Sequence, residues 1–266
     1  MSHYLTRADS PFGGSVWRMI DDAVVGAARP LLAGRRLLDL EGPYGFGTTM
    51  VSVGDVPVGE EGKAIARTPR MIPLTLLEEG FRIPVRDIAS FERSGMPFDL
   101  STVAKAAMNV AIHEDDLLFH GSPEAGVDGL LTMNGTLSVE TDWETTGSGV
   151  DSVLRAVNAL DDAGFHGPYT LALAPGQYNR LFRRYPDSDL TERMHLEQII
   201  TGGIVKAPLC QEGGLVIAVG ASFASIVLGQ DLATGFIGPA GGDYAFFIVE
   251  SVALRVRRPD AVCILK

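Results

Sequence analysis

Hydrophobic positions near the N-terminus recur at helical spacing. Between Ser15 and Leu32 the apolar residues fall on one side of a helix and the charged residues on the other; the apolar set is Val16, Trp17, Ile20, Val24, Ala27, Ala28 and Leu31. This pattern predicts an amphipathic helix. Because Pro30 has no backbone N–H to donate, we expect the helix to end or kink at about Arg29.

The next segment follows an extended pattern. From Thr48 to Leu77 the chain reads as two arms of similar length around the charged turn VGEEG, which contains Glu60 and Glu61. This pattern predicts a long hairpin. A two-stranded hairpin with few apolar residues cannot form a core of its own. We therefore expect this hairpin to pack on something outside its own subunit.

The most regular helical pattern is DLSTVAKAAMNVAIHEDDLLFHG. Asp99 or Ser101 provides an N-cap and Gly121 follows the last turn, which predicts a helix from about Leu100 to Phe119. A polar stretch separates it from the remaining elements, which we expect to be a helix at about Val150 to Ala163, a strand at Tyr169 to Ala174, a helix near Gly176, and strands from Leu215 to Leu265. This order lacks regular βαβ alternation and predicts an α+β fold.

Composition limits the function classes. The chain has 266 residues, of which 46% are hydrophobic and 21% charged, so we expect part of its apolar surface to be buried between subunits. A net charge of −11 opposes attraction to nucleic acid or anionic lipid, and neither is an expected partner. The N-terminal stretch MSHYLTRADSPF has no features of a secretory signal, so we expect a cytoplasmic protein.

The glycine-rich stretch GRRLLDLEGPYGFGTT does not favour a phosphate-binding loop. Pro43 lacks an N–H, no Lys-Ser/Thr pair follows Gly47, and the chain from Thr48 onward is extended rather than helical. A phosphate loop needs free backbone N–H groups followed by a helix N-terminus. We therefore expect these glycines to serve backbone geometry and close packing.

Candidate metal and nucleophile residues are better explained by structure than by catalysis. His113, Asp116 and His120 fall at i, i+3 and i+7 of a predicted helix, but HExxH spacing and a fourth ligand are missing. Cys210 and Cys263 lie far apart without CxxC spacing, which is typical of free structural thiols. No serine lies in a GxSxG motif. We predict that the chain is not an enzyme and binds no metal.

Four segments carry a resemblance to a known family. GRRLLDLEGPYGFG, HGPYTLAL, VLGQDLATGF and FFIVESVALRV resemble the encapsulin shell proteins, also called linocin-type bacteriocins, in the right order along essentially the whole chain. The resemblance implies the fold of tailed-phage major capsid proteins, of the Hong Kong 97 type. It also implies a peripheral domain (1–47, 74–126 and 223–266), an extended loop (48–73) and an axial domain (127–222).

The resemblance also implies a function. About sixty copies, or a multiple, close into an icosahedral shell that encloses a ferritin-like, hemerythrin-like or dye-decolourising peroxidase cargo for iron handling or oxidative stress. Cargo enzymes of this family carry a C-terminal targeting peptide, which docks in an apolar groove between the N-terminal helix and nearby strands. The positions that match the groove are Ile20, Val24, Arg35, Asp39, Leu232 and Phe236.

An axial loop of this family surrounds the five-fold pore, and the matching residues here are Asp187, Ser188 and Asp189. Some members bind flavin at an aromatic residue where this chain has Arg86, so no flavin or other cofactor is expected. Two alternatives stay open at this point. A phage major capsid protein would share the fold and package DNA, and a net charge of −11 does not exclude it, because only the inner face of a capsid meets DNA. The other alternative is a small-molecule α+β enzyme.

Overall fold

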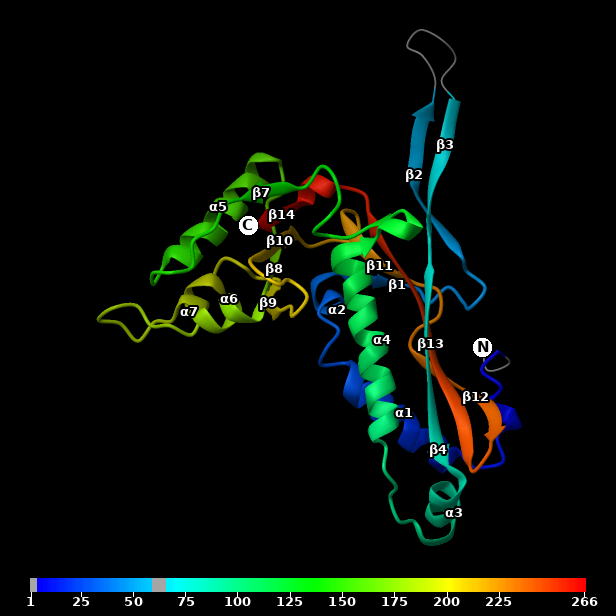
Figure 1. Cartoon of the computed structure of the whole chain (residues 1–266). Helices are drawn as coiled ribbons and strands as arrows, with labels where there is room; N and C mark the ends of the chain where they lie inside the picture. The colour runs from blue at the N-terminus through cyan, green and yellow to red at the C-terminus, as the bar shows by residue number, and fades with distance from the viewer. Residues whose placement is uncertain (1–3, 59–65) are drawn as a thin grey trace.

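The computed structural model describes residues 4–58 and 66–266 and is built around one long helix, α4 (Ser101–His120). Asp99 precedes this helix, and its carboxylate accepts a hydrogen bond from the backbone N–H of Ser101 at 2.8 Å. Gly121 ends the helix with φ 74°. The predicted helix from about Leu100 to Phe119 is therefore confirmed. Figure 1 shows α4 running along the main body of the molecule.

The main body contains a sheet in which β13 (Asp243–Val256) is central. One edge of β13 pairs with β4. The other edge pairs with β12 along its first part and with β11 along its last part, and β11 also pairs in parallel with β1. The bounds of these strands are β1 Asp39–Glu41, β4 Thr75–Pro84, β11 Ala224–Leu228 and β12 Ala233–Ala240. Helices α1 and α4 pack on this sheet (Figure 1).

The N-terminal helix α1 (Gly14–Ala28) buries the predicted stripe, including Val16, Ile20 and Val24. Its last turn ends at Ala28 with Arg29 as C-cap, one residue before Pro30, as predicted. Under the helix, the rings of Phe81 and Phe246 stack with centroids 5.1 Å apart. The helix therefore joins the core of the main body through one apolar face.

A two-stranded hairpin, formed by β2 (Met50–Val58) and β3 (Ala66–Pro73), projects away from the main body (Figure 1). The predicted turn at Glu60 and Glu61 lies outside the described residues. None of the described hairpin residues belongs to the three buried hydrophobic clusters of the fold. The hairpin prediction is confirmed, but the extended chain does not end at Leu77: it continues as β4 to Pro84, because β4 pairs with β13 over its whole length.

The second body has its own sheet and core, beside the upper end of α4 in Figure 1. Its sheet has the order β7 (Leu137–Val139), β14 (Val262–Leu265), β10 (Gly214–Ala218), β8 (Tyr169–Leu173) and β9 (Gly203–Lys206). Its helices are α5 (Ser148–Asp162), α6 (Pro175–Arg180) and α7 (Glu192–Leu196). The helices expected near Val150 and Gly176 and the strand from Tyr169 are therefore confirmed.

The C-terminal strand β14 corrects the predicted domain boundary at one end. We expected all of residues 223–266 in the peripheral domain, but β14 pairs with β10 and β7 in the sheet of the second body. The backbone hydrogen bonds of this strand are satisfied there, and its side chains enter the core of that body. The rest of the predicted division into peripheral domain, extended loop and axial domain stays a prediction.

Short elements connect these parts: α2 (Gly34–Leu37), α3 (Val85–Ser94), β5 (Gly121–Ser122), β6 (Val127–Asp128), η1 (Arg7–Asp9), η2 (Pro123–Ala125) and η3 (Pro259–Ala261). The loop after β1 shows why a glycine is needed there. Gly42 has φ 109°, and a Cβ on it would lie 2.4 Å from the carbonyl oxygen of Leu228. The same oxygen accepts the N–H of Tyr44 at 3.0 Å. Glycine thus permits close packing at this turn, as the sequence predicts.

Candidate binding groove

Two adjoining hollows form a groove beside α1, which we call the α1 groove. They share Val25 and Leu232, and their volumes are about 850 Å³ and about 330 Å³. The larger hollow is lined by Val25, Ala28, Arg29, Pro30, Leu32, Arg35, Arg36, Leu40, Asp231 and Leu232. The smaller one is lined by Leu5, Arg7, Asp21, Val24, Val25, Leu232, Ala233 and Thr234.

Exposed apolar side chains make part of the larger hollow apolar. Val25 on α1 is 55% exposed and Leu40 on β1 is 48% exposed. Leu232 lies in the connection between β11 and β12, where it is partly buried against the core of the main body. A helix, a strand and a connection thus meet at one apolar surface that the described chain leaves uncovered. Such a surface suits the apolar side chains of a peptide.

The residues predicted for the groove do not all lie on its surface. Arg35 and Leu232 line the larger hollow, and Val24 lines the smaller one although it is almost fully buried. Asp39 is exposed on β1 beside Leu40 but does not line either hollow. Ile20 and Phe236 are 0% and 5% exposed and belong to the core of the main body. Side chains so deeply buried have almost no area to offer a peptide.

Sequence reasoning missed Val25 and Leu40. Val25 follows Val24 directly and is therefore turned by roughly 100° around the helix axis, away from the buried stripe. An apolar residue outside the buried face of an amphipathic helix can indicate a binding surface, and Val25 is such a residue. Leu40 stands between Asp39 and Glu41 in a three-residue strand, where period-two alternation is too short to indicate which face is covered.

A buried charge cluster holds one wall of the α1 groove in place. Arg35 Nε donates to Glu114 Oε1 at 2.8 Å, Arg35 Nη1 donates to Asp231 Oδ1 at 2.9 Å, and Arg35 Nη2 donates to Glu250. The side chains of Glu114 and Glu250 are fully buried. Burial, followed by the charge of Glu114, raises the pKa of Glu250 well above its ordinary value. Arg35 thus joins Glu114, Glu250 and Asp231 in one cluster.

The N-terminal segment forms another wall. The carbonyl oxygen of Leu5 accepts the N–H of Phe236 at 2.9 Å, so the segment lies along the edge of β12. Arg7 donates to the carbonyl oxygen of Thr234 at 2.7 Å and forms a two-point ion pair with Asp21. The hydroxyl of Thr234 is buried and has no hydrogen-bond partner within residues 4–58 and 66–266.

The three predicted pore residues lie together in the exposed loop between α6 and α7. Asp187 has φ 57°, Ser188 Oγ accepts the N–H of Leu190 at 3.0 Å, and Asp189 lies 3.4 Å from Arg184. In Figure 1 this loop is the part of the second body that lies farthest from α4. It is anchored at its base by the ion pair of Arg183 with the fully buried Glu192. The loop therefore presents two carboxylates on a fixed support.

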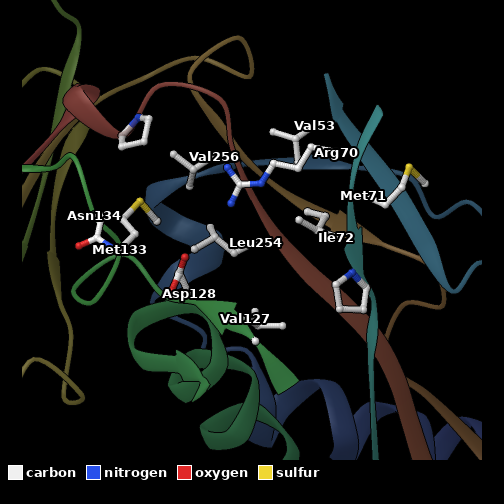
Figure 2. Close-up of a pocket in the computed structure, with 13 residues that line it drawn as sticks. Val53, Arg70, Met71, Ile72, Val127, Asp128, Met133, Asn134, Leu254 and Val256 are labelled. Carbon is white, nitrogen blue, oxygen red and sulfur yellow. The ribbon is translucent and has the colours of Figure 1, made fainter. Parts of the chain in front are cut away.

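Another hollow, of about 320 Å³, lies at the base of the hairpin. Figure 2 shows Arg70 of β3 pointing into it, with Asp128 of β6 on the opposite wall. Neither residue forms an ion pair with any other residue that the structure describes. The remaining lining is mostly apolar and includes Val53, Ile72, Val127 and Leu254. The hollow thus separates the base of the hairpin from residues 126–128, which follow α4.

Two of the three candidate metal residues, Asp116 and His120, pair with each other. His120 Nδ1 lies 2.7 Å from Asp116 Oδ1. Among the described residues no group of three His, Cys, Asp or Glu side chains is arranged to hold a metal ion. Cys210 and Cys263 are buried free thiols, as predicted, and burial raises the pKa of Cys263 to about 11. No helix in the described part of the chain is long and apolar enough to cross a membrane.

A long helix packed on a sheet, a projecting hairpin and a second α/β body are also the features of a capsid-like fold. A virus-like particle from Pyrococcus furiosus has this fold with a TM-score of 0.73, at 20% identity over 94% of this chain and 99% of that chain. The capsid of the myovirus phage XM1 has it with a TM-score of 0.56, at 13% identity over 86% of this chain and 88% of that chain. The predicted α+β fold of the Hong Kong 97 type is confirmed.

The family follows from sequence. The model of the Linocin_M18 family, described as "Encapsulating protein for peroxidase", matches residues 1–253. The type 1 encapsulin shell protein EncA of Myxococcus xanthus is 32% identical over 100% of this chain and 97% of its own length. This chain belongs to the family of encapsulin shell proteins. The phage capsid is similar in fold alone, so the family assignment favours the shell over the DNA-packaging alternative.

Proposed function

We propose that about sixty copies of this chain, or a multiple, close into an icosahedral shell and that the α1 groove binds the C-terminal targeting peptide of an enzyme held inside. The enzyme is of the ferritin-like, hemerythrin-like or dye-decolourising peroxidase class. In this proposal the chemistry belongs to the enclosed enzyme, and the shell itself is non-catalytic, binds no cofactor and assembles in the cytoplasm.

The exposed apolar surface of the α1 groove is the observation that carries the peptide-binding part. Val25 and Leu40 are large apolar side chains left about half exposed at a hollow of about 850 Å³. Fully burying an apolar side chain of the peptide against them contributes about 1.5 kcal/mol or more, so two or three such anchors supply most of the affinity of a short peptide. Arg35 and Asp231, held by the buried charge cluster, give this apolar surface a fixed polar edge.

Two features support the assembly part of the proposal. The hairpin has no core, and β4 pairs with β13 along one edge only, which leaves its other edge without a strand partner in residues 4–58 and 66–266. An unpaired edge of ten residues favours association with another chain. Leu76 on β4 and Met108 and Ile112 on α4 are large apolar side chains that are more than 40% exposed. Neighbouring copies in a shell would cover both features.

A double substitution tests the groove. In Val25→Asp/Leu40→Asp, two charges replace the apolar anchors at positions where the side chains already face solvent, so the core is spared. We expect intact shells with cargo loading reduced by about tenfold or more, measured as cargo-to-shell ratio by mass spectrometry of purified particles.

The matched control is Ser15→Asp, which adds a carboxylate to an exposed position in the first turn of the same helix. We expect this control to load normally. Undiminished loading of the double variant would contradict the assignment of the peptide to the α1 groove.

A further inference from the structure

Two arginines at one end of the α1 groove form no ion pair with a carboxylate of residues 4–58 or 66–266. Arg29 caps the C-terminus of α1 and Arg36 lies in α2, and both are exposed. Arg36 donates a long hydrogen bond to the carbonyl oxygen of Leu32, at 3.4 Å, and its charge acts on the buried Asp115 from beyond ion-pair distance. Arg35 and Asp231, the other charged lining residues, already bind each other. The unpaired lining charge is therefore positive, on a chain with a net charge of −11.

The positive charge is confined to one end of the groove. Arg29 and Arg36 line only the larger hollow. The smaller hollow, which joins it at Val25 and Leu232, contains Arg7 and Asp21, and these two neutralise each other in a two-point ion pair. A peptide that lies along the groove thus meets a neutral end, an apolar middle and a positive end.

We propose that Arg29 and Arg36 bind the terminal carboxylate of the docked peptide. This inference rests on the proposed function, because a targeting peptide at the C-terminus of its protein always carries this group. Guanidinium groups donate strong, charge-assisted hydrogen bonds to a carboxylate, more so beside an apolar surface that excludes water.

The consequence is a rule of recognition. The apolar middle of the groove binds the anchor side chains of the peptide. The two arginines require that the peptide end a short distance beyond these anchors. The same peptide placed inside a longer chain loses the carboxylate at this position. The groove thereby selects genuine chain ends over internal segments of similar sequence.

Loading of a fluorescent reporter tests the inference. One reporter ends with the last twelve residues of the enzyme found in purified particles, and a second carries the same tail followed by Gly-Ser-Gly-Ser, which moves the carboxylate away from the arginines. Each is co-expressed at limiting level with wild-type shells or with Arg29→Gln/Arg36→Gln shells. A charge control, Arg18→Gln, removes an exposed arginine of α1 that does not line the groove.

In wild-type and Arg18→Gln shells we expect the extended reporter to load about tenfold less than the natural one. In the double arginine variant we expect both reporters to load equally, at the lower level, into particles of normal size. Equal loading of the two reporters into wild-type shells would overturn the carboxylate assignment while the proposed function stands. Failure of both reporters to enter wild-type shells would instead contradict the proposed function.

Discussion

The carboxylate of Asp115 accepts a hydrogen bond from the backbone N–H of Gly34 at 2.9 Å. Its other oxygen accepts the N–H of Ala33 at 2.8 Å, so one side chain of α4 satisfies both amides at the start of α2. A Cβ on Gly34 would lie 2.5 Å from Leu118 Cδ1, which shows how closely α2 approaches α4. This contact places Arg35, the next residue, in the wall of the α1 groove.

Asp115 gives the fold a pH dependence. Burial raises its pKa to about 6 from the ordinary 3.8, despite the two amide hydrogen bonds. The folded state therefore holds the proton more tightly, and the resulting stability is present in full below pH 3.8 and is lost as the pH rises through 6. Its size is about 3 kcal/mol. We expect that Asp115→Asn removes the contribution of Asp115 to the fall in stability between pH 4 and pH 7.

Melting temperatures of wild-type and Asp115→Asn particles at pH 4 and pH 7 measure the effect. The variant is expected to be less stable at both pH values, because the amide places an NH2 group, which is a donor, against one of the two N–H groups. Its stability is expected to fall less with pH than that of the wild type. The same fall in both proteins would show that Asp115 does not titrate in this range.

The buried cluster around Arg35 responds differently to two substitutions. Glu250→Gln keeps the shape of a side chain whose pKa burial raises well above its ordinary value, so we expect a change of less than about 1 kcal/mol in the free energy of unfolding. Arg35→Met leaves Glu114 as a buried charge without a partner and is expected to cost about 3–5 kcal/mol. Urea unfolding of the two variants at pH 7 makes the comparison. Equal destabilisation of the two variants would contradict this difference.

Most elements of this fold could be predicted from local patterns. The spacing of apolar residues and the end signals Asp99, Gly121 and Pro30 give the bounds of α4 and α1 to within about two residues. The placement of β14 could not be predicted in this way. Its sequence VCIL is apolar at every position, which is typical of any buried strand, and its partners β7 and β10 are distant in sequence.

The groove was only partly predictable for a related reason. The stripe of α1 that periodicity identifies is the side that faces the core, so Ile20 is buried where a surface residue was expected. The surface of the groove comes from residues such as Val25 and Leu40, which interrupt the pattern of their elements. Leu232, which lies across the groove from them, is about two hundred positions away in the sequence. Only the family resemblance indicated that Leu232 belongs to the groove.

The hairpin is expected to be required for assembly and dispensable for folding. Gly54 and Arg70 face each other in the β2–β3 ladder, so residues 55–69 can be replaced by Asn-Gly as a two-residue turn. Because no described hairpin residue contributes to a buried cluster, we expect a folded, soluble subunit that forms no shells. Circular dichroism shows whether the subunit is folded, and size-exclusion chromatography shows whether it forms shells. Particles of normal size from this variant would contradict it.

The loop of Asp187 and Asp189 is expected to attract cations if it surrounds a five-fold pore, because symmetry repeats each carboxylate five times. Asparagine tolerates the positive φ of Asp187, so Asp187→Asn/Asp189→Asn removes the charge and keeps the turn. With an iron-oxidising cargo inside, we expect Fe²⁺ uptake to slow by roughly two- to tenfold at low salt and by less at high salt.

Asp162→Asn serves as the control, because it removes an exposed carboxylate from the end of α5 in the same body. We expect its uptake rate to match that of the wild type. If the loop variant also matches the wild type at both salt concentrations, the carboxylates do not steer cations and the opening acts by size alone.

The mass of the purified particle tests the central claim most directly. Native mass spectrometry or light scattering, combined with electron microscopy, gives the number of copies and shows whether they close. We expect closed particles of about 1.7 MDa without cargo, which is sixty copies of a 28.4 kDa chain, or a multiple of that mass. A protein that stays monomeric or dimeric at all concentrations would contradict it.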